Sequence, residues 1–270
     1  MIEIGIDPVA VVIGSFELRW YGILTAVAVM VLMVWMYIQI HRGAKISYDS
    51  LLGGALVGIP SGIIFARLLH VIDRWSFYSQ NPGQIIGGEG LAIYGAILGA
   101  ALGVWVYSRF VDFKYAYVAD VITPGIILAQ MVGRVGCVIN GCCYGETVTD
   151  LPWGVIYTHS DCYAPIGIPV HPTNAYEIIF LGVLFAGIMI WRSRFKVEGS
   201  QFLFYLGMYS LWRIGVGVLR VQTPFLFGLE QAQVIGIITA AICFPLLIFK
   251  IIKYRQEKSQ AGEQKAGTNE

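Results

Sequence analysis

The chain has 270 residues, of which 57% are hydrophobic and 13% are charged, and its formal net charge is +1. Soluble domains contain about 45–50% apolar and about 25% charged residues. This composition, with a mean hydropathy of +0.68, argues against a soluble domain and favours an all-α integral membrane protein. The near-zero net charge gives no reason to expect a nucleic-acid partner.

The N-terminal segment, MIEIGID, carries two acids and no base. It therefore lacks the basic start of a secretory signal peptide, and we expect the first apolar run to be retained as a span. A bilayer core about 30 Å thick requires roughly 20 mostly apolar residues per helix. Seven segments qualify, near residues 20–40, 51–72, 91–109, 115–133, 174–191, 201–219 and 231–251. We predict a seven-helix membrane domain over 1–252, with a polar connection at 134–173, and a disordered cytoplasmic tail over 253–270.

Basic residues are distributed unevenly between the connections. Those after the first, third, fifth and seventh predicted spans hold twelve of the eighteen Lys and Arg residues, namely Arg42, Lys45, Arg109, Lys114, Arg192, Arg194, Lys196, Lys250, Lys253, Arg255, Lys258 and Lys265. Cytoplasmic connections carry such an excess. The pattern predicts that the N-terminus lies outside, the C-terminus inside, and the 134–173 connection on the extracytoplasmic side.

Ionisable side chains within predicted spans form a second signal, because each costs about 2.5–3.5 kcal/mol to insert and usually has a partner or a function. They are Arg67, His70, Asp120, Arg134, Glu177 and Arg213, with Arg220 just beyond a span. The predicted topology brings most of the arginines to the outer leaflet. Since the arginine fork matches phosphate, we predict a pocket for a phospholipid headgroup. The alternative is that each arginine extends to lipid headgroups or pairs with an acid such as Glu177.

Three cysteines follow Arg134 in the stretch GRVGCVINGCCYGE. Their spacing differs from that of structural zinc sites, although His159 and His171 are further candidate ligands for a metal ion. Because the loop is predicted to face an oxidising compartment, we favour a disulfide among Cys137, Cys142, Cys143 and Cys162 over a metal site. A catalytic thiol beside Arg134 is a third reading.

Two further stretches carry polar residues into spans. In GGEGLAIYGAILGA, Tyr94 lies among glycines, which is typical of close helix packing or of a site. In HPTNAYE, Pro172 predicts a helix start. There His171 and Glu177 form either an acid–base pair, or an interface anchor and an arginine partner.

Six motifs in order resemble those of the bacterial prolipoprotein diacylglyceryl transferases. They are LRWYGI (18–23), ARLLHV (66–71), GLAIYGAILG (90–99), GRVGCVINGCCYG (133–145), HPTNAYE (171–177) and LWRIGVGVLR (211–220). The resemblance covers about residues 15 to 250. It implies a multi-pass transferase of the bacterial cytoplasmic (inner) membrane that acts in lipoprotein biosynthesis, a form of protein modification.

Members of that family move the diacylglyceryl group of phosphatidylglycerol to the lipobox cysteine thiol of a prolipoprotein, form a thioether and release glycerol phosphate. The implied partners are phosphatidylglycerol, the lipobox peptide and membrane lipid, with no metal and no cofactor. By motif position, Arg134 and Arg213 resemble the two essential arginines, Tyr94 completes the expected catalytic set as a positioning group, and Asp120 matches an acid of the fourth span. The expected substrate-binding residues are Arg134, Arg213, Arg220, Tyr21, Asn140, Arg67, Gly95, Tyr176 and Glu177.

The chain also departs from the family pattern. Tyr94 stands where many members have His, Cys137 and Cys142 replace Asn and Glu, and Gly217 replaces a glutamate. We interpret the cysteines as structural substitutions around an anion site. Two other functions stay open: a diverged phospholipid-binding paralogue with another acceptor, or none, and an anion transporter, although the repeated halves common in transporters are not evident.

Overall fold

The computed structural model describes residues 1–14, 16–87, 92–111, 114–221 and 225–267. The chain forms two compact units, residues 1–35 with 119–270, and residues 36–118. The stretch 88–91 of the glycine-rich motif lies outside the described residues.

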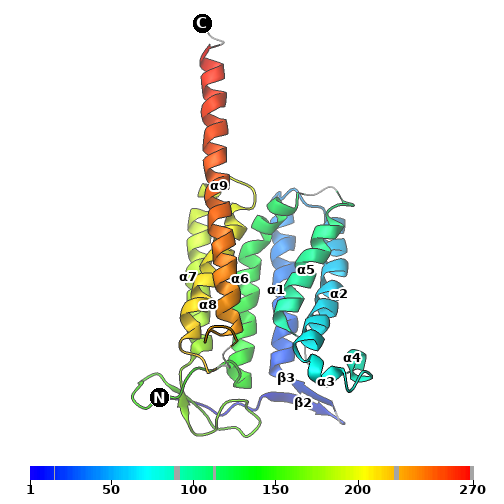
Figure 1. The fold of residues 1–270 in the computed structure, drawn as a ribbon, viewed down its shortest axis with the longest axis vertical. Helices are drawn as coiled ribbons and strands as arrows, with labels where there is room; N and C mark the ends of the chain where they lie inside the picture. The colour runs from blue at the N-terminus through cyan, green and yellow to red at the C-terminus, as the bar shows by residue number, and fades with distance from the viewer. Residues whose placement is uncertain (15, 88–91, 112–113, 222–224, 268–270) are drawn as a thin grey trace. The chain divides into compact units, whose positions relative to one another are not determined.

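Helices dominate both units (Figure 1). Those that match the predicted segments are α1 (Trp20–His41), α2 (Tyr48–Asp73), α5 (Ile93–Tyr107), α6 (Tyr115–Asn140), α7 (Thr173–Trp191), α8 (Ser200–Gly217) and α9 (Gln231–Gly267). Within the described ranges, five helices are long and apolar enough to cross a membrane, in α1, α2, α6, α7 and α9. The chain is an integral membrane protein. Among the described residues, α5 forms only a shorter apolar helix over Tyr94–Tyr107.

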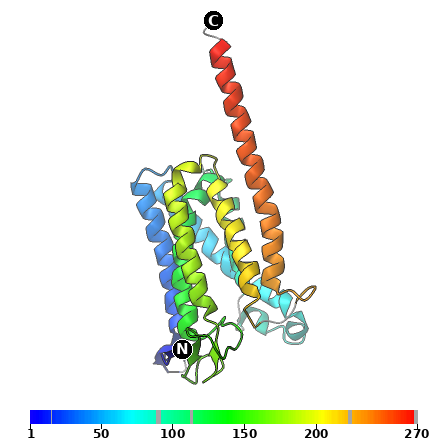
Figure 2. The ribbon, with the colours of Figure 1, turned by 90° about the vertical axis from the view of Figure 1, so that its left-hand side faces the viewer.

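Short strands are a feature that the sequence did not predict. The strands β1 (Ile2–Ile4), β4 (Val155–Tyr157) and β5 (Pro169–Val170) form one sheet, in which β1 runs parallel to β4 and β5 antiparallel to it. The strands β2 (Val9–Ile13) and β3 (Phe16–Arg19) form a hairpin. The all-α prediction is therefore confirmed for the helical body and incomplete outside it. The sheet ties the N-terminus to the connection between α6 and α7, as Figure 2 shows.

The core of the first unit lies among α6, α7 and α8, which run side by side in Figures 1 and 2. Its fully buried residues are Ile127, Leu181, Leu184, Ile188 and Tyr205. Many large apolar side chains elsewhere on these helices are exposed, including Ile179, Val183 and Ile190 of α7. Because lipid tails are as apolar as these side chains, exposure of this kind is expected for a membrane protein.

Asp120 joins two of these helices at the start of α8. Its Oδ2 accepts a hydrogen bond from the backbone N–H of Gly199 at 2.7 Å, and its Oδ1 accepts one from the N–H of Phe202 at 2.9 Å. Gln201 Nε2 donates to the backbone oxygen of Asp120 at 2.7 Å. The first N–H groups of a helix have no partner within it, and an acid there also complements the helix dipole. Asp120 therefore caps α8 from α6.

The second unit contains α2, α5, and the short helices α3 (Trp75–Tyr78) and α4 (Gln84–Gly87). Helices α2 and α5 pack closely through small residues. A Cβ at Gly95 would lie 2.3 Å from the backbone oxygen of Phe65, so only glycine fits there. This contact accords with close helix packing for the glycine-rich motif.

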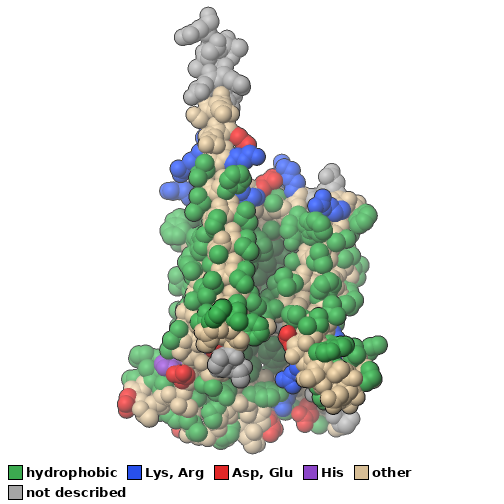
Figure 3. Space-filling view, viewed as in Figure 1, with side chains coloured by type: hydrophobic (Ala, Val, Ile, Leu, Met, Phe, Trp, Pro, Cys, Tyr) green, Lys and Arg blue, Asp and Glu red, His purple; other side chains and the backbone are tan. Residues whose placement is uncertain are grey.

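Helix α9 continues to Gly267, whereas the sequence predicted a disordered tail from residue 253. The segment is rich in Ala, Glu, Gln and Lys, which are strong helix formers, and this propensity explains the difference. Figure 3 shows hydrophobic side chains along the first part of α9 and basic side chains gathered beyond them. Such a boundary is typical of a span that ends at a membrane surface.

Candidate functional site

A carboxylate from α7 lies at the centre of the candidate site. Glu177 is fully buried, with 0% of its side chain exposed, and three arginines converge on it. Arg134 Nε lies 2.8 Å from Glu177 Oε1. Arg213 Nη1 lies 3.7 Å and Arg220 Nη2 3.6 Å from Glu177 Oε2. Of the two readings of Glu177, that of an arginine partner is confirmed.

Each arginine comes from a different place in the chain. Arg134 lies in the last two turns of α6, Arg213 near the end of α8, and Arg220 just after α8. Tyr209 lies one turn before Arg213, and its hydroxyl donates to Glu177 Oε1 at 2.8 Å. The convergence therefore depends on the packing of α6, α7 and α8.

The cluster carries more positive charge than its carboxylate compensates. Three guanidinium groups share the single carboxylate of Glu177, so the cations outnumber it. Arg213 Nη1, Arg220 Nε and Arg220 Nη2 are buried and make no hydrogen bond with the described residues. Burial, with Arg213 and Arg134 nearby, lowers the pKa of Arg220, although a guanidinium still stays charged. Buried donors of this kind normally have a partner, so the arrangement favours an anionic ligand.

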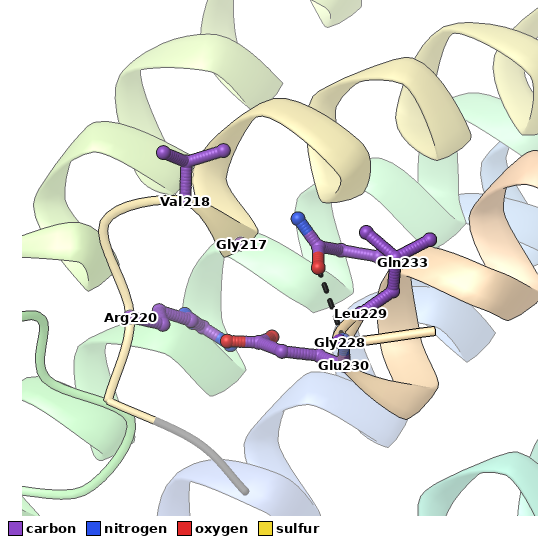
Figure 4. A pocket seen from close by; sticks show the side chains of 7 residues that line it. All are labelled: Gly217, Val218, Arg220, Gly228, Leu229, Glu230 and Gln233. Atoms are coloured by element: carbon purple, nitrogen blue, oxygen red, sulfur yellow. Dashed lines mark hydrogen bonds between the residues drawn. The ribbon is translucent and has the colours of Figure 1, made fainter. Parts of the chain in front are cut away.

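A cavity of about 310 Å³ opens beside Arg220. Its lining residues are Gly217, Val218, Arg220, Gly228, Leu229, Glu230 and Gln233 (Figure 4). Glu230, with 7% exposure, and Arg220 point toward one another across it. Burial raises the pKa of Glu230, while Arg213 and Arg220 oppose that rise. Glu230 is therefore a buried acid next to the excess cations.

Gly217 stands in α8 where the family pattern predicts a glutamate. Its surroundings indicate where the acid of this cavity comes from instead. A Cβ at Gly217 would lie 2.7 Å from Cγ of Gln233, so Gln233 occupies the space that a side chain at 217 requires. Gln233 also accepts a hydrogen bond from the Glu230 backbone N–H at 3.0 Å. The carboxylate in this cavity thus comes from the start of α9. Sequence reasoning missed Glu230, and its one signal was an acid directly before an apolar span.

The cysteine-bearing loop after α6 is fixed against α7 and the segment before Arg220. Thr173 Oγ1 donates to the backbone oxygen of Cys143 at 2.6 Å, and Asn174 Nδ2 donates to that of Cys142 at 2.7 Å. The N–H of Glu146 donates to the backbone oxygen of Leu219 at 2.8 Å. These bonds hold the thiols beside the arginine cluster.

The three thiols form a compact group. The Sγ atoms of Cys137, Cys142 and Cys143 lie within 4.8 Å of one another, and Arg134 Nη1 lies 3.7 Å from Cys137 Sγ. Hydrogen bonds from Cys137 and Cys142, with Arg134 and Arg220 nearby, lower the pKa of Cys143. Burial raises that of Cys162.

The expected disulfide is wrong, because all five cysteines, each in the described part of the chain, are free. The Cys162 thiol points instead to the backbone oxygen of Ile139 at 3.9 Å. Adjacent residues such as Cys142 and Cys143 have Cα atoms about 3.8 Å apart, below the usual disulfide range of about 4.4–6.8 Å.

Comparison with known proteins shows the family to which the chain belongs. The sequence model of the family "Prolipoprotein diacylglyceryl transferase" matches residues 8–249. A phosphatidylglycerol–prolipoprotein diacylglyceryl transferase of Dehalococcoides mccartyi (strain CBDB1) is 50% identical over 256 residues, which is 95% of this chain and 98% of the relative. The chain belongs to the prolipoprotein diacylglyceryl transferase family. Relatives with the same name from Clostridioides difficile (36% identical, 86% of this chain and 90% of the relative) and Lysinibacillus sphaericus (31%, 93% and 94%) are more distant.

Three further residues matched to family positions lie in the first unit. Asn140 is buried, and its Oδ1 accepts a hydrogen bond from Arg19 at 3.4 Å. Tyr21 is 42% exposed. The Tyr176 hydroxyl accepts from Trp153 Nε1 at 2.8 Å and lies 3.3 Å from His171 Nδ1, so it faces the connection between α6 and α7.

The remaining family positions lie in the unit of residues 36–118. There Arg67 Nε donates to the backbone oxygen of Ile85 at 2.8 Å, and its guanidinium stacks on the ring of Tyr78 at 5.2 Å. Tyr94 and Gly95 begin α5. Arg67 is thus held against α4 and the ring of Tyr78.

Proposed function

We propose that this chain transfers the diacylglyceryl group of phosphatidylglycerol to the lipobox cysteine thiol of bacterial prolipoproteins. The observation that carries the proposal is the cluster of Arg134, Arg213 and Arg220 around the buried Glu177, whose excess positive charge and free donors suit a phosphate. The names of relatives that are 50% identical support the same reaction.

In this proposal the arginines bind the phosphate and Glu177 positions them. A guanidinium fork donates two parallel hydrogen bonds to phosphate oxygens, and it stays charged when it is removed from water. Arg213 Nη1 and the free Arg220 donors supply these bonds. Glu177 lowers the repulsion among three cations without neutralising them. It is therefore a positioning residue rather than a lipid ligand, unlike the role the sequence predicted for it.

The acceptor thiolate attacks the primary glyceryl carbon of the diacylglyceryl group. A sulfur–carbon bond forms, the carbon–oxygen bond to phosphate breaks, and the leaving glycerol phosphate takes the electron pair. The phosphate thereby changes from a monoanionic diester to a dianionic monoester. Fixed cations stabilise this increase in charge, and the loss of one such donor typically costs about 2.7–4 kcal/mol of activation free energy.

The acceptor thiol must lose its proton, and we assign this step to Glu230. A carboxylate whose pKa is raised toward neutrality is a better base than an ordinary one, and burial acts on Glu230 in that direction. Its place beside Arg220 brings the base next to the phosphate site (Figure 4). Tyr94 keeps the proposed role of positioning the thiol or headgroup.

The proposed topology has seven spans, with the N-terminus outside the bacterial cytoplasmic membrane. Lys250 Nζ donates to the backbone oxygen of Glu198 at 2.8 Å, so the basic segments before α8 and along α9 meet at one end of the first unit. The arginine cluster lies at the other end of α8. With basic connections inside, the cluster faces the outer leaflet, where secreted prolipoproteins emerge.

Transfer in liposomes tests the function directly. Purified protein is mixed with head-group-labelled and acyl-labelled phosphatidylglycerol and a lipobox peptide. We expect acyl label on the peptide as a thioether and head-group label in released glycerol phosphate. Arg134→Ala should lower the rate by about 10²–10³-fold. Arg109→Ala, which removes an arginine stacked on Trp105 at 4.6 Å, is the matched control and should keep the rate.

The outcome separates the remaining alternatives. Lipid binding by a folded protein without thioether product would favour a paralogue with another acceptor. Anion flux through the liposome membrane without product would favour a transporter.

A further inference from the structure

The thiols of Cys137, Cys142 and Cys143 form a group that the transfer reaction does not use. Their Sγ atoms lie within 4.8 Å of one another. Cys137 is buried, Cys142 is half-buried and Cys143 is exposed, so the group reaches from the end of α6 to the surface. Three ligand atoms therefore lie around one point that is open on one side.

The backbone brings these thiols together at a conformational cost. Cys143 has a φ of 59°, in the left-handed region. A side chain other than glycine in this region costs about 1–3 kcal/mol when the surroundings impose it. The bonds from Thr173 and Asn174 to the backbone oxygens of Cys143 and Cys142 hold this turn. The turn places the thiols of Cys142 and Cys143 beside that of Cys137 at the end of α6.

Thiolates are the preferred ligands of soft metal ions such as Zn²⁺ and Cu⁺. A tetrahedral site with Zn–S distances of about 2.3 Å has sulfur atoms about 3.8 Å apart. The spacing here exceeds that value by at most about 1 Å, a distance that a side-chain rotation covers. Three protein ligands leave a fourth position for water or an external ligand.

The charge of the surroundings also fits such an ion. Three thiolates with one divalent ion carry a net charge of −1. The site adjoins Arg134, whose Nη1 lies 3.7 Å from Cys137 Sγ, and the cluster has more guanidinium groups than carboxylates. An anionic metal–thiolate group is therefore stabilised where an additional cation by itself would be repelled.

We propose that Cys137, Cys142 and Cys143 bind a soft divalent metal ion through three thiolates, and that this ion is Zn²⁺ in the cell. The ion joins the end of α6, which carries Arg134, to the loop that is bonded to α7. It thereby stabilises the wall of the arginine cluster. This site goes beyond the transfer reaction, for which no metal step is invoked.

Metal binding by the purified full chain tests the proposal. Reduced protein in detergent is loaded with Zn²⁺ and desalted, and the bound metal is measured by mass spectrometry. Co²⁺ replaces Zn²⁺ in a parallel sample, because thiolate ligands give cobalt an intense charge-transfer absorption. We expect about one ion per chain and a strong absorption band. Zn²⁺ should also raise the thermal midpoint of unfolding.

Matched cysteine variants make the test specific. Cys143→Ser changes an exposed side chain and should weaken metal binding by more than the roughly 10–100-fold that loss of an outer-shell partner costs. Cys162→Ser and Cys243→Ser lie outside the group and should bind like the parent chain. Equal zinc retention by Cys143→Ser and the parent would overturn the proposal, as would a missing charge-transfer band. Neither readout depends on transfer activity, so this site and the proposed function fail independently.

Discussion

The two ends of α6 carry half-buried charged side chains whose hydrogen bonding differs. Near its start, both carboxylate oxygens of Asp120 accept backbone N–H groups of α8. Near its end, Arg134 joins two further arginines on one glutamate, and several of their donors have no hydrogen-bond partner among the described residues. A buried charge that is fully bonded stabilises a fold, whereas one left with spare donors provides a binding site.

Glu177→Gln should have the largest effect, because it removes the buried counter-charge and leaves three arginines close together. Removing one partner of a buried ion pair costs about 3–5 kcal/mol of stability. We expect unfolding in detergent at a lower urea concentration than for the parent chain. Phosphatidylglycerol should restore part of the loss, since its phosphate replaces the carboxylate. A variant as stable as the parent without lipid would show that Glu177 does not hold the cluster.

Asp120→Ala should lower stability nearly as much as Glu177→Gln but should leave the transfer rate unchanged. It removes an ionised acceptor of two backbone N–H groups, and hydrogen bonds to charged groups contribute about 1.5–3 kcal/mol each. We expect easier chemical unfolding and an unchanged transfer rate per folded molecule. Asp120→Asn keeps an acceptor and should lose less. A selective loss of transfer with normal stability would contradict the structural role of this end of α6.

Tyr209→Phe tests how the arginine end of α6 depends on the position of Glu177. Its hydroxyl donates to Glu177 Oε1 at 2.8 Å, and the loss of one bond to a charged acceptor should cost about 1.5 kcal/mol. Transfer should slow by less than in Arg134→Ala, because the arginines remain. Comparing the rates of Tyr209→Phe and Tyr205→Phe, whose hydroxyl bonds to Gln130 at 2.8 Å, checks this. Equal rate losses would mean that Tyr209 acts through general packing.

The smallest expected effect is a change in pH dependence. Burial raises the pKa of Glu230, and a base acts only in its ionised form. The transfer rate should therefore fall as the pH drops through this raised pKa, and the fall should begin at a higher pH than for an exposed glutamate. Glu230→Gln should remove this limb of the profile. An unchanged profile would assign proton removal to another group.

Part of the fold and part of the candidate site could be predicted from the sequence alone. Among the described residues, five helices long and apolar enough to cross a membrane lie where the apolar runs predicted them, because this apolar length is a local property of the chain. Arg134, Arg213 and Arg220 were likewise identifiable, since a charge in an apolar run is costly wherever it occurs. The family motifs pointed to the same arginines.

Other features depended on contacts between distant segments. The role of Glu177 as a common partner of three arginines requires α6, α7 and α8 to be packed together. Glu230 enters the site because Gly217 leaves room that Gln233 fills. The thiol group depends on a left-handed turn at Cys143 held from α7. The membrane helices and the cationic character of the site could be predicted from side chains along single segments. Which carboxylate each cation meets depends on the folded chain, because a Coulomb interaction depends on distances that distant segments set together.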